Sequence, residues 1–189
     1  MTLCTEQRIC FLGRVVSGEM CLSPAGEMVD TVWGNLGRYY PGVSVDAYVV
    51  MPNHVHGIIV LSGMETGNGE RVGRADRHGG TVPTDGTGGT NPTEGTVGMG
   101  GAMSGRRPSL STVMQRFKSF TTYEYGKGVR SSGWPRYPGR LWQHRFHEHV
   151  IRNERELNGM REYIANNPLQ WHLDRENPER LQQVRSERG

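Results

Sequence analysis

Two histidines of this 189-residue chain have the spacing from which a metal site could be built. His54 and His56 stand two apart in a β-rich run. Their side chains therefore leave a strand on the same face, where two imidazoles can share a divalent cation. A His-x-His pair on a strand also occurs in surface and packing roles, so the spacing permits a metal site without identifying one.

A tyrosine and an asparagine form the second part of this constellation. Tyr163 lies in a predicted helix that begins with the capping box of Asn153 and Glu156 and ends before Pro168. Asn167 follows one turn later, about 40° around the helix, so its amide oxygen can share a site with the phenol. An oxygen ligand beside two imidazoles suits Mg²⁺ or Mn²⁺. The alternative is a packing role for the tyrosine and a helix-end role for the asparagine.

Positive charge is concentrated in one band of the sequence. The formal net charge is only +3, yet residues 106–145 contain nine basic residues against Glu124 alone, together with seven aromatic residues. Basic residues interleaved with aromatics suit a surface that binds single-stranded nucleic acid. The alternative is a solvated basic face over core aromatics. The candidate DNA contacts are Arg116, Lys118, Arg130, Arg136 and His149.

Hydrophobic periodicity and cap residues predict an α+β fold with helices packed on a sheet. The predicted helices cover 24–36, 110 to a stop at Gly126, and 154–167, and the predicted strands cover 43–50, 54–61 and 141–151. Pro52 and Asn53 predict a tight turn that joins the first two strands into a hairpin. The catalytic domain is therefore expected in two parts, 1–62 and 108–175, followed by a polar tail over 176–189.

Residues 63–107 are predicted to be a disordered insertion, because they are rich in Gly, Thr and Pro and lack hydrophobic periodicity. The sequence has no run near the roughly 20 apolar residues that span a bilayer and no signal-peptide pattern. Its three cysteines lack the spacing of a zinc site or a disulfide framework. A cytoplasmic protein without a membrane partner is therefore expected, and either a monomer or a homodimer is compatible with the sequence.

Two separated motifs resemble those of a known family. The segment YVVMPNHVHGIIVL at 48–61 resembles the His-hydrophobe-His motif of the single-tyrosine (HUH) transposases of the IS200 type. The segment REYIANNP at 161–168 resembles the tyrosine helix of the REP-associated tyrosine transposases. Further segments that match this subgroup are LSTVMQRFKSFTT at 110–122, LWQHRFHEHVIRNERELN at 141–158 and W-x-L-D at 171–174.

The resemblance implies that His54 and His56 bind Mg²⁺ or Mn²⁺, that Asn167 is the third ligand, and that Tyr163 is the nucleophile. It implies a ferredoxin-like antiparallel sheet with helices on one face. It further implies an endonuclease and transposase that nicks and rejoins single-stranded DNA beside hairpins of repetitive elements through a 5′-phosphotyrosine. No external energy source is then needed, because the phosphotyrosine linkage retains the bond energy.

Two departures from the family pattern bear on activity. The sequence begins at what we predict to be the first strand, so the family's N-terminal DNA-binding arm is expected to be missing. The insertion also interrupts the connection after the histidine strand. The alternative interpretation is a domesticated or truncated protein that binds hairpin DNA with little turnover.

Overall fold

The computed structural model describes residues 1–62 and 108–180. The predicted disordered insertion over 63–107 and the last nine residues of the predicted tail lie outside the described residues. Within the described part of the chain, no helix is long and apolar enough to cross a membrane.

The sheet contains three antiparallel strands in the order β1-β5-β4. These are β1 Thr2–Cys4, β4 Val43–Met51 and β5 His54–Leu61. The predicted hairpin is confirmed, with Met51 opposite His54 across the turn and β5 in the centre of the sheet. Thr2 lies opposite His56 on the other side of β5. The histidine strand is therefore held by hydrogen bonds along both edges.

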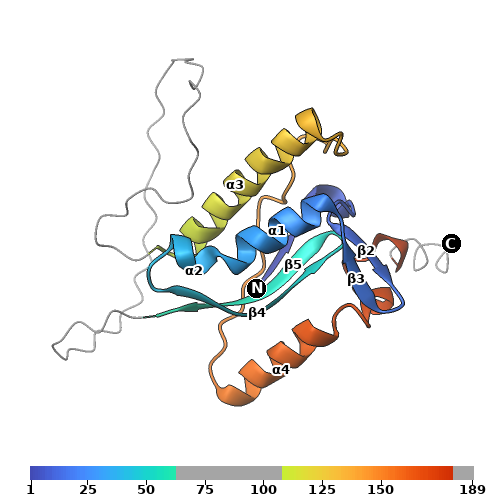
Figure 1. The fold of residues 1–189 in the computed structure, drawn as a ribbon. Helices are drawn as coiled ribbons and strands as arrows, with labels where there is room; N and C mark the ends of the chain where they lie inside the picture. Colours follow the sequence, from blue (N-terminus) through green and yellow to red (C-terminus); the bar gives the residue numbers. More distant parts are fainter. Residues whose placement is uncertain (63–107, 181–189) are drawn as a thin grey trace, which may run out of the picture.

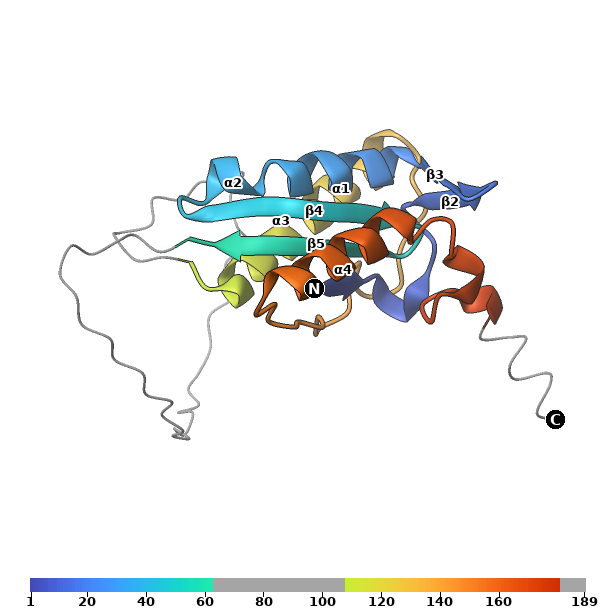
Figure 2. The ribbon, with the colours of Figure 1, turned by 90° about the horizontal axis from the view of Figure 1, so that it is seen from below.

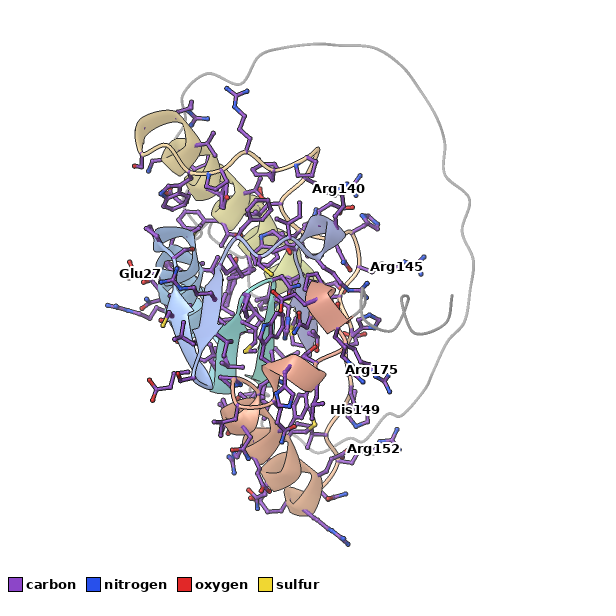
Figure 3. The ribbon with its side chains drawn as sticks, turned by 90° about the vertical axis from the view of Figure 1, so that its right-hand side faces the viewer. Glu27, Arg140, Arg145, His149, Arg152 and Arg175 are labelled. Carbon is purple, nitrogen blue, oxygen red and sulfur yellow. The ribbon has the colours of Figure 1, made fainter. Side chains whose placement is uncertain are left out.

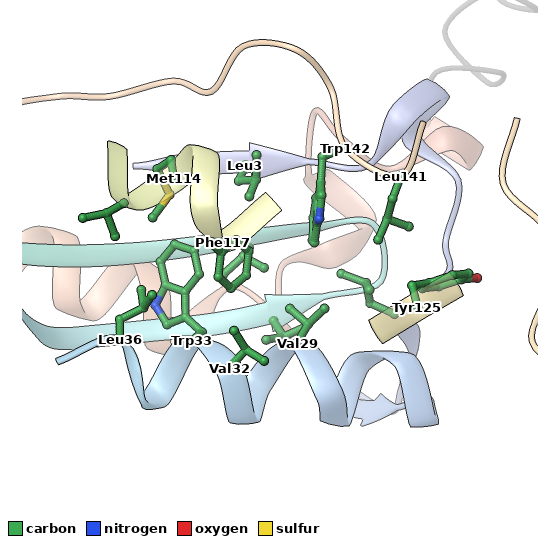
Figure 4. Packing of buried hydrophobic residues seen from close by; sticks show 14 of the residues in the cluster. Leu3, Val29, Val32, Trp33, Leu36, Met114, Phe117, Tyr125, Leu141 and Trp142 are labelled. Carbon is green, nitrogen blue, oxygen red and sulfur yellow. The ribbon is translucent and has the colours of Figure 1, made fainter. Parts of the chain in front are cut away.

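Three helices pack on one face of this sheet. They are α1 Pro24–Gly34, the short α2 Leu36–Tyr39, and α3 Leu110–Ser131 (Figure 1). Ser23 and Ser109 cap α1 and α3, each side chain accepting a hydrogen bond from the backbone N–H three residues on. The core between helices and sheet includes Trp33, Phe117 and Trp142 (Figure 4).

The fourth helix, α4 Glu154–Asn166, covers the opposite face of the sheet (Figures 1 and 2). The α+β class with an antiparallel sheet is confirmed, but the expectation of helices on one face is wrong. The cause lies in β5, which is buried on both faces. Val55 belongs to the core under α1 and α3, whereas His54 and His56 alternate to the other face and are covered from the side of α4.

Two further predictions are corrected. The helix predicted to stop at Gly126 continues to Ser131, because Gly128 lets the Trp134 ring pack directly on its backbone. No strand forms over 141–151, which pairs with Thr2 of β1 and with Thr5 only at isolated bridges. Between the Gln143–Cys4 and His147–Thr2 hydrogen bonds this segment advances four residues while β1 advances two, so a regular ladder cannot form.

A second sheet was not predicted. It is the hairpin of β2 Gly13–Val16 and β3 Glu19–Leu22, which precedes α1. Two 3-10 turns complete the described elements, η1 Glu6–Arg8 after β1 and η2 Trp171–Leu173 after α4. Both turns lie beside the histidine end of β5, since Arg8 of η1 contacts Asn53 and Trp171 of η2 contacts His54.

Candidate metal centre and tyrosine

The histidine pair forms the floor of the candidate site. His54 and His56 are 0% and 7% exposed, and their ring centroids are 4.4 Å apart. Burial lowers the pKa of both imidazoles to about 3. Both rings are therefore neutral at physiological pH, which is the form that binds a metal ion.

Asn53 fixes which nitrogen of His54 carries the proton. The Asn53 Nδ2 donates to the carbonyl oxygens of Arg8 and Glu176, at 2.9 and 2.7 Å. The Asn53 Oδ1, which can only accept, lies 2.9 Å from His54 Nδ1. His54 therefore donates from Nδ1, and its Nε2 presents a lone pair that is buried and has no hydrogen-bond partner among the described residues.

Thr2 contacts the corresponding nitrogen of His56. Its hydroxyl lies 2.8 Å from His56 Nδ1 across the β1–β5 pair. A hydroxyl can accept as well as donate, so this contact is compatible with Nδ1–H on His56 and a lone pair on its Nε2, which lies 3.4 Å from the Tyr163 hydroxyl. Each ring can thus offer one nitrogen to a shared cation.

An aspartate that the sequence reasoning did not assign joins the histidines. One ligand atom each from His54, His56 and Asp174 lie within 4.8 Å of one another. The Asp174 Oδ1 accepts a hydrogen bond from the Glu176 backbone N–H, while Oδ2 lies 3.9 Å from His54 Nε2. The only sequence signal was the W-x-L-D segment, whose Trp171 ring lies 6.0 Å from that of His54.

Tyr163 reaches this group from α4. Its hydroxyl lies 3.4 Å from His56 Nε2, although 44% of the residue is exposed. Burial of the phenol and the charge of Asp174 raise the pKa of Tyr163, and a hydrogen bond with the Asn167 side chain opposes that shift. The predicted proximity of the tyrosine, the asparagine and the histidines is thus observed.

The amide of Asn167 fits a cation site. The residue is 3% exposed, and its Oδ1 is buried with no partner among the described residues. An amide oxygen left unpaired in a buried site costs free energy unless a ligand satisfies it. His54 Nε2 and Asn167 Oδ1 are thus two buried acceptors, each of which a bound cation or, for Asn167, an ordered water would satisfy.

A bidentate ion pair fixes α4 over the sheet. The guanidinium of Arg161 donates to both carboxylate oxygens of Asp46, at 2.8 and 2.6 Å. Asp46 lies where the register of β4 shifts between Val45 and Tyr48. The irregular part of β4 thus provides the anchor for the tyrosine helix.

The site opens to solvent through a cavity of about 340 Å³. Tyr163, Asn167 and Asp174 lie in its wall together with two arginines, Arg175 and Arg180. A cavity with the neutral imidazole of His56, carboxylate and amide oxygens, and guanidinium groups can hold a cation beside a phosphate.

The predicted DNA contacts lie apart from this cavity. Arg116, Lys118 and Arg130 are on α3, across the sheet from α4. Lys118 Nζ donates to the carbonyl oxygens of Gln143 and His144, at 2.9 and 3.0 Å. The remaining two are exposed: Arg136 follows α3, and His149 pairs with Glu156. The DNA role of all five stays a prediction.

The chain is similar to known proteins in sequence and in structure. No protein-family model matches the chain. An uncharacterized protein of Haemophilus influenzae is 29% identical over 177 residues, which cover 92% of this chain and 81% of that protein. A solved structure of a REP-associated tyrosine transposase bound to a REP hairpin is 19% identical, with a TM-score of 0.49 over 89% of this chain. The chain spans 64% of that transposase chain.

Proposed function

We propose that the chain is a metal-dependent endonuclease that nicks and rejoins single-stranded DNA through Tyr163. One observation carries the proposal: the Tyr163 hydroxyl lies 3.4 Å from His56 Nε2, in a cavity that also contains Asn167 and Asp174. The motif resemblance supports the same roles and adds hairpin-containing repeats as the DNA source.

In the proposed reaction the Tyr163 oxygen attacks phosphorus and the bond to the 3′-oxygen breaks. The phenolic proton passes to solvent, the leaving 3′-oxygen is protonated, and the 5′-phosphate remains on the tyrosine. A bound Mg²⁺ or Mn²⁺ would polarise the phosphate and stabilise the charge that develops on it. His54 and His56, with Asp174 or Asn167, would hold the ion. The reverse attack by a 3′-hydroxyl rejoins the strand.

A hairpin-binding protein with little turnover is the second candidate. The observation that favours it is the raised pKa of Tyr163 in the absence of a cation, which lowers the fraction of phenolate at neutral pH. Adduct formation separates the two functions.

The first prediction tests the proposed function with a labelled single-stranded hairpin oligonucleotide and Mn²⁺. The protein should form a covalent adduct that survives denaturing electrophoresis. Tyr163→Phe keeps the ring and removes the oxygen, so it should bind the oligonucleotide yet form no adduct. Tyr123→Phe, at an exposed tyrosine of α3, is the matched control and should behave as the parent protein.

Two results would contradict the assignment separately. An adduct that still forms with Tyr163→Phe overturns the nucleophile. An adduct that forms equally in EDTA overturns the metal requirement.

A further inference from the structure

Exposed arginines line one side of the molecule. Figure 3 shows Arg140, Arg145, Arg175 and Arg152 along the same side, with Glu27 on the opposite one. All four arginines are exposed. They come from two parts of the chain, the irregular segment between α3 and α4 and the stretch after η2. We call these four residues the arginine row.

Most of the row has unused hydrogen-bonding capacity. Within residues 1–62 and 108–180, no hydrogen bond or ion pair engages the guanidinium of Arg140, Arg145 or Arg175. Arg8 and Arg161 differ, since each forms an ion pair with a carboxylate. An unpaired guanidinium presents donors in a fork that matches the oxygens of a phosphate.

The backbone that carries Arg140 and Arg145 is fixed even though it forms neither helix nor strand. Lys118 Nζ holds the carbonyl oxygens of the two residues before Arg145. Two residues beyond it, His147 exchanges both backbone hydrogen bonds with Thr2, at 2.8 and 2.9 Å. The row therefore projects from a pre-organised edge, which lowers the entropy lost on binding.

The row also leads into the cavity of the candidate site. Arg175 lies in the wall of the cavity that contains Tyr163 and Asn167, whereas Arg140 lies outside it, in the wall of a second hollow beside α3. A phosphate that the tyrosine attacks must come to about 3–3.5 Å from its oxygen. The backbone of an unpaired strand can bend into such a cavity, whereas a stacked duplex is too stiff.

From these observations we propose that the arginine row is the track along which the backbone of single-stranded DNA reaches Tyr163. The proposal rests on the proposed function and adds the surface that binds the strand beyond the reacting phosphate. It assigns the strand to the side of 140–152 and 175, which meets α3 at the hollow that Arg140 and Lys118 share.

The second prediction is that the row contributes to affinity without metal or chemistry. We would measure fluorescence anisotropy of a labelled single-stranded oligonucleotide in EDTA, with Tyr163→Phe as the background. Adding Arg140→Gln and Arg145→Gln removes two charges outside the cavity. With a slope of about 0.7 per phosphate, the plot of log affinity against log salt should flatten by about 1.4. At 0.1 M salt the affinity should fall by about 25-fold.

Arg14→Gln with Arg38→Gln is the matched control, because both arginines are exposed and lie on β2 and α2. It removes the same charge and should change affinity less than about 2-fold by general electrostatics. Thermal melting of each variant checks the fold.

Each outcome of these measurements either supports or overturns the proposed track. Unchanged affinity in the row variant, an equal loss in the control, or no binding by the background protein overturns the track. An equal loss for a blunt duplex of the same length overturns the assignment to a single strand. Row-dependent binding by a protein that forms no adduct leaves the track standing and refutes the proposed nuclease.

Discussion

Asn53 and Thr2 contact the two candidate metal ligands at their Nδ1 atoms, while His54 Nε2 lies 3.9 Å from Asp174 Oδ2 and His56 Nε2 lies 3.4 Å from the Tyr163 hydroxyl. Such outer-shell partners fix the tautomer and orientation of a histidine ligand. Asn53 also binds the carbonyl oxygens before and after the site, on Arg8 and Glu176. One buried amide thus connects the first turn of the chain, the histidine strand and the segment that bears Asp174.

Asp174 and Asn167 offer different oxygens to the same cation, and their contributions can be separated. The third prediction compares Asp174→Asn with Asn167→Ala by calorimetric titration of Mn²⁺. Loss of a carboxylate charge should weaken binding by about 10-fold or more, because charge count tunes the affinity of oxygen sites. Loss of a neutral amide should weaken it less, since water can take its place.

Glu179→Gln is the control for this comparison, because it removes a charge from an exposed carboxylate that lies outside the histidine group. It should leave the dissociation constant nearly unchanged. If Asn167→Ala weakened Mn²⁺ binding more than Asp174→Asn did, this result would exclude Asp174 as a ligand and favour the amide of Asn167.

At this scale, sequence reasoning found most of the candidate site. The period of a strand placed His54 and His56 on one face, and the period of a helix placed Asn167 beside Tyr163. Asp174 was not predicted as a metal ligand, because it follows Pro168 and a 3-10 turn, where no regular period relates one side chain to the next. Its position depends on long-range contacts such as the hydrogen bond from Asn53 to Glu176.

Some helices and strands were predicted from the sequence, and others were not. The hairpin of β4 and β5 and the caps of α1, α3 and α4 were predicted, because their signals are local in the sequence. The end of α3, the course of 141–151 and the second face of the sheet were not. Each depends on contacts between distant residues, such as those of Thr2 with His147 and of Tyr163 with His56.

The fourth prediction concerns the two glycines of α3. A Cβ on Gly128 would lie 2.2 Å from Trp134 Cδ2, so Gly128→Ala must displace the indole from its contact with Tyr125. We expect the free energy of unfolding to fall by about 1–3 kcal/mol. A Cβ on Gly126 would meet only Arg130 Nη1, at 3.4 Å. Gly126→Ala should therefore stabilise the protein by about 0.5–1 kcal/mol.

Urea unfolding of both variants measures these changes. Because the glycines lie two residues apart in one helix, differences in helix propensity cancel between them. If both variants shift the midpoint in the same direction, the packing of Trp134 does not explain why the helix passes Gly128.

The whole molecule places its large aromatic core and its candidate site on opposite faces of one sheet. Trp33 and Phe117 pack under α1 and α3, while Tyr163 and Asn167 come from α4 on the other side. The two layers meet at β5, whose residues alternate between them. Changes to cavity residues should therefore leave the core packing largely intact.

The tyrosine and the histidine that it approaches, 3.4 Å apart, belong to a single polypeptide. The fifth prediction follows in genetic terms: two defective copies should not rescue each other. Tyr163→Phe lacks the nucleophile and His56→Ala lacks a ligand, so neither forms a complete site. When the two variants are co-expressed and purified together, the yield of adduct should stay at the level of each variant alone.

Protein in which adjacent chains exchange α4 would behave differently. In mixed dimers one of the two sites would regain both residues, and a substantial part of the parent activity would return. Recovery of the adduct would therefore contradict a site built within one chain. If no adduct is recovered, every copy of this protein must inherit its tyrosine and its histidines together, because a neighbouring copy cannot supply the residue that is missing.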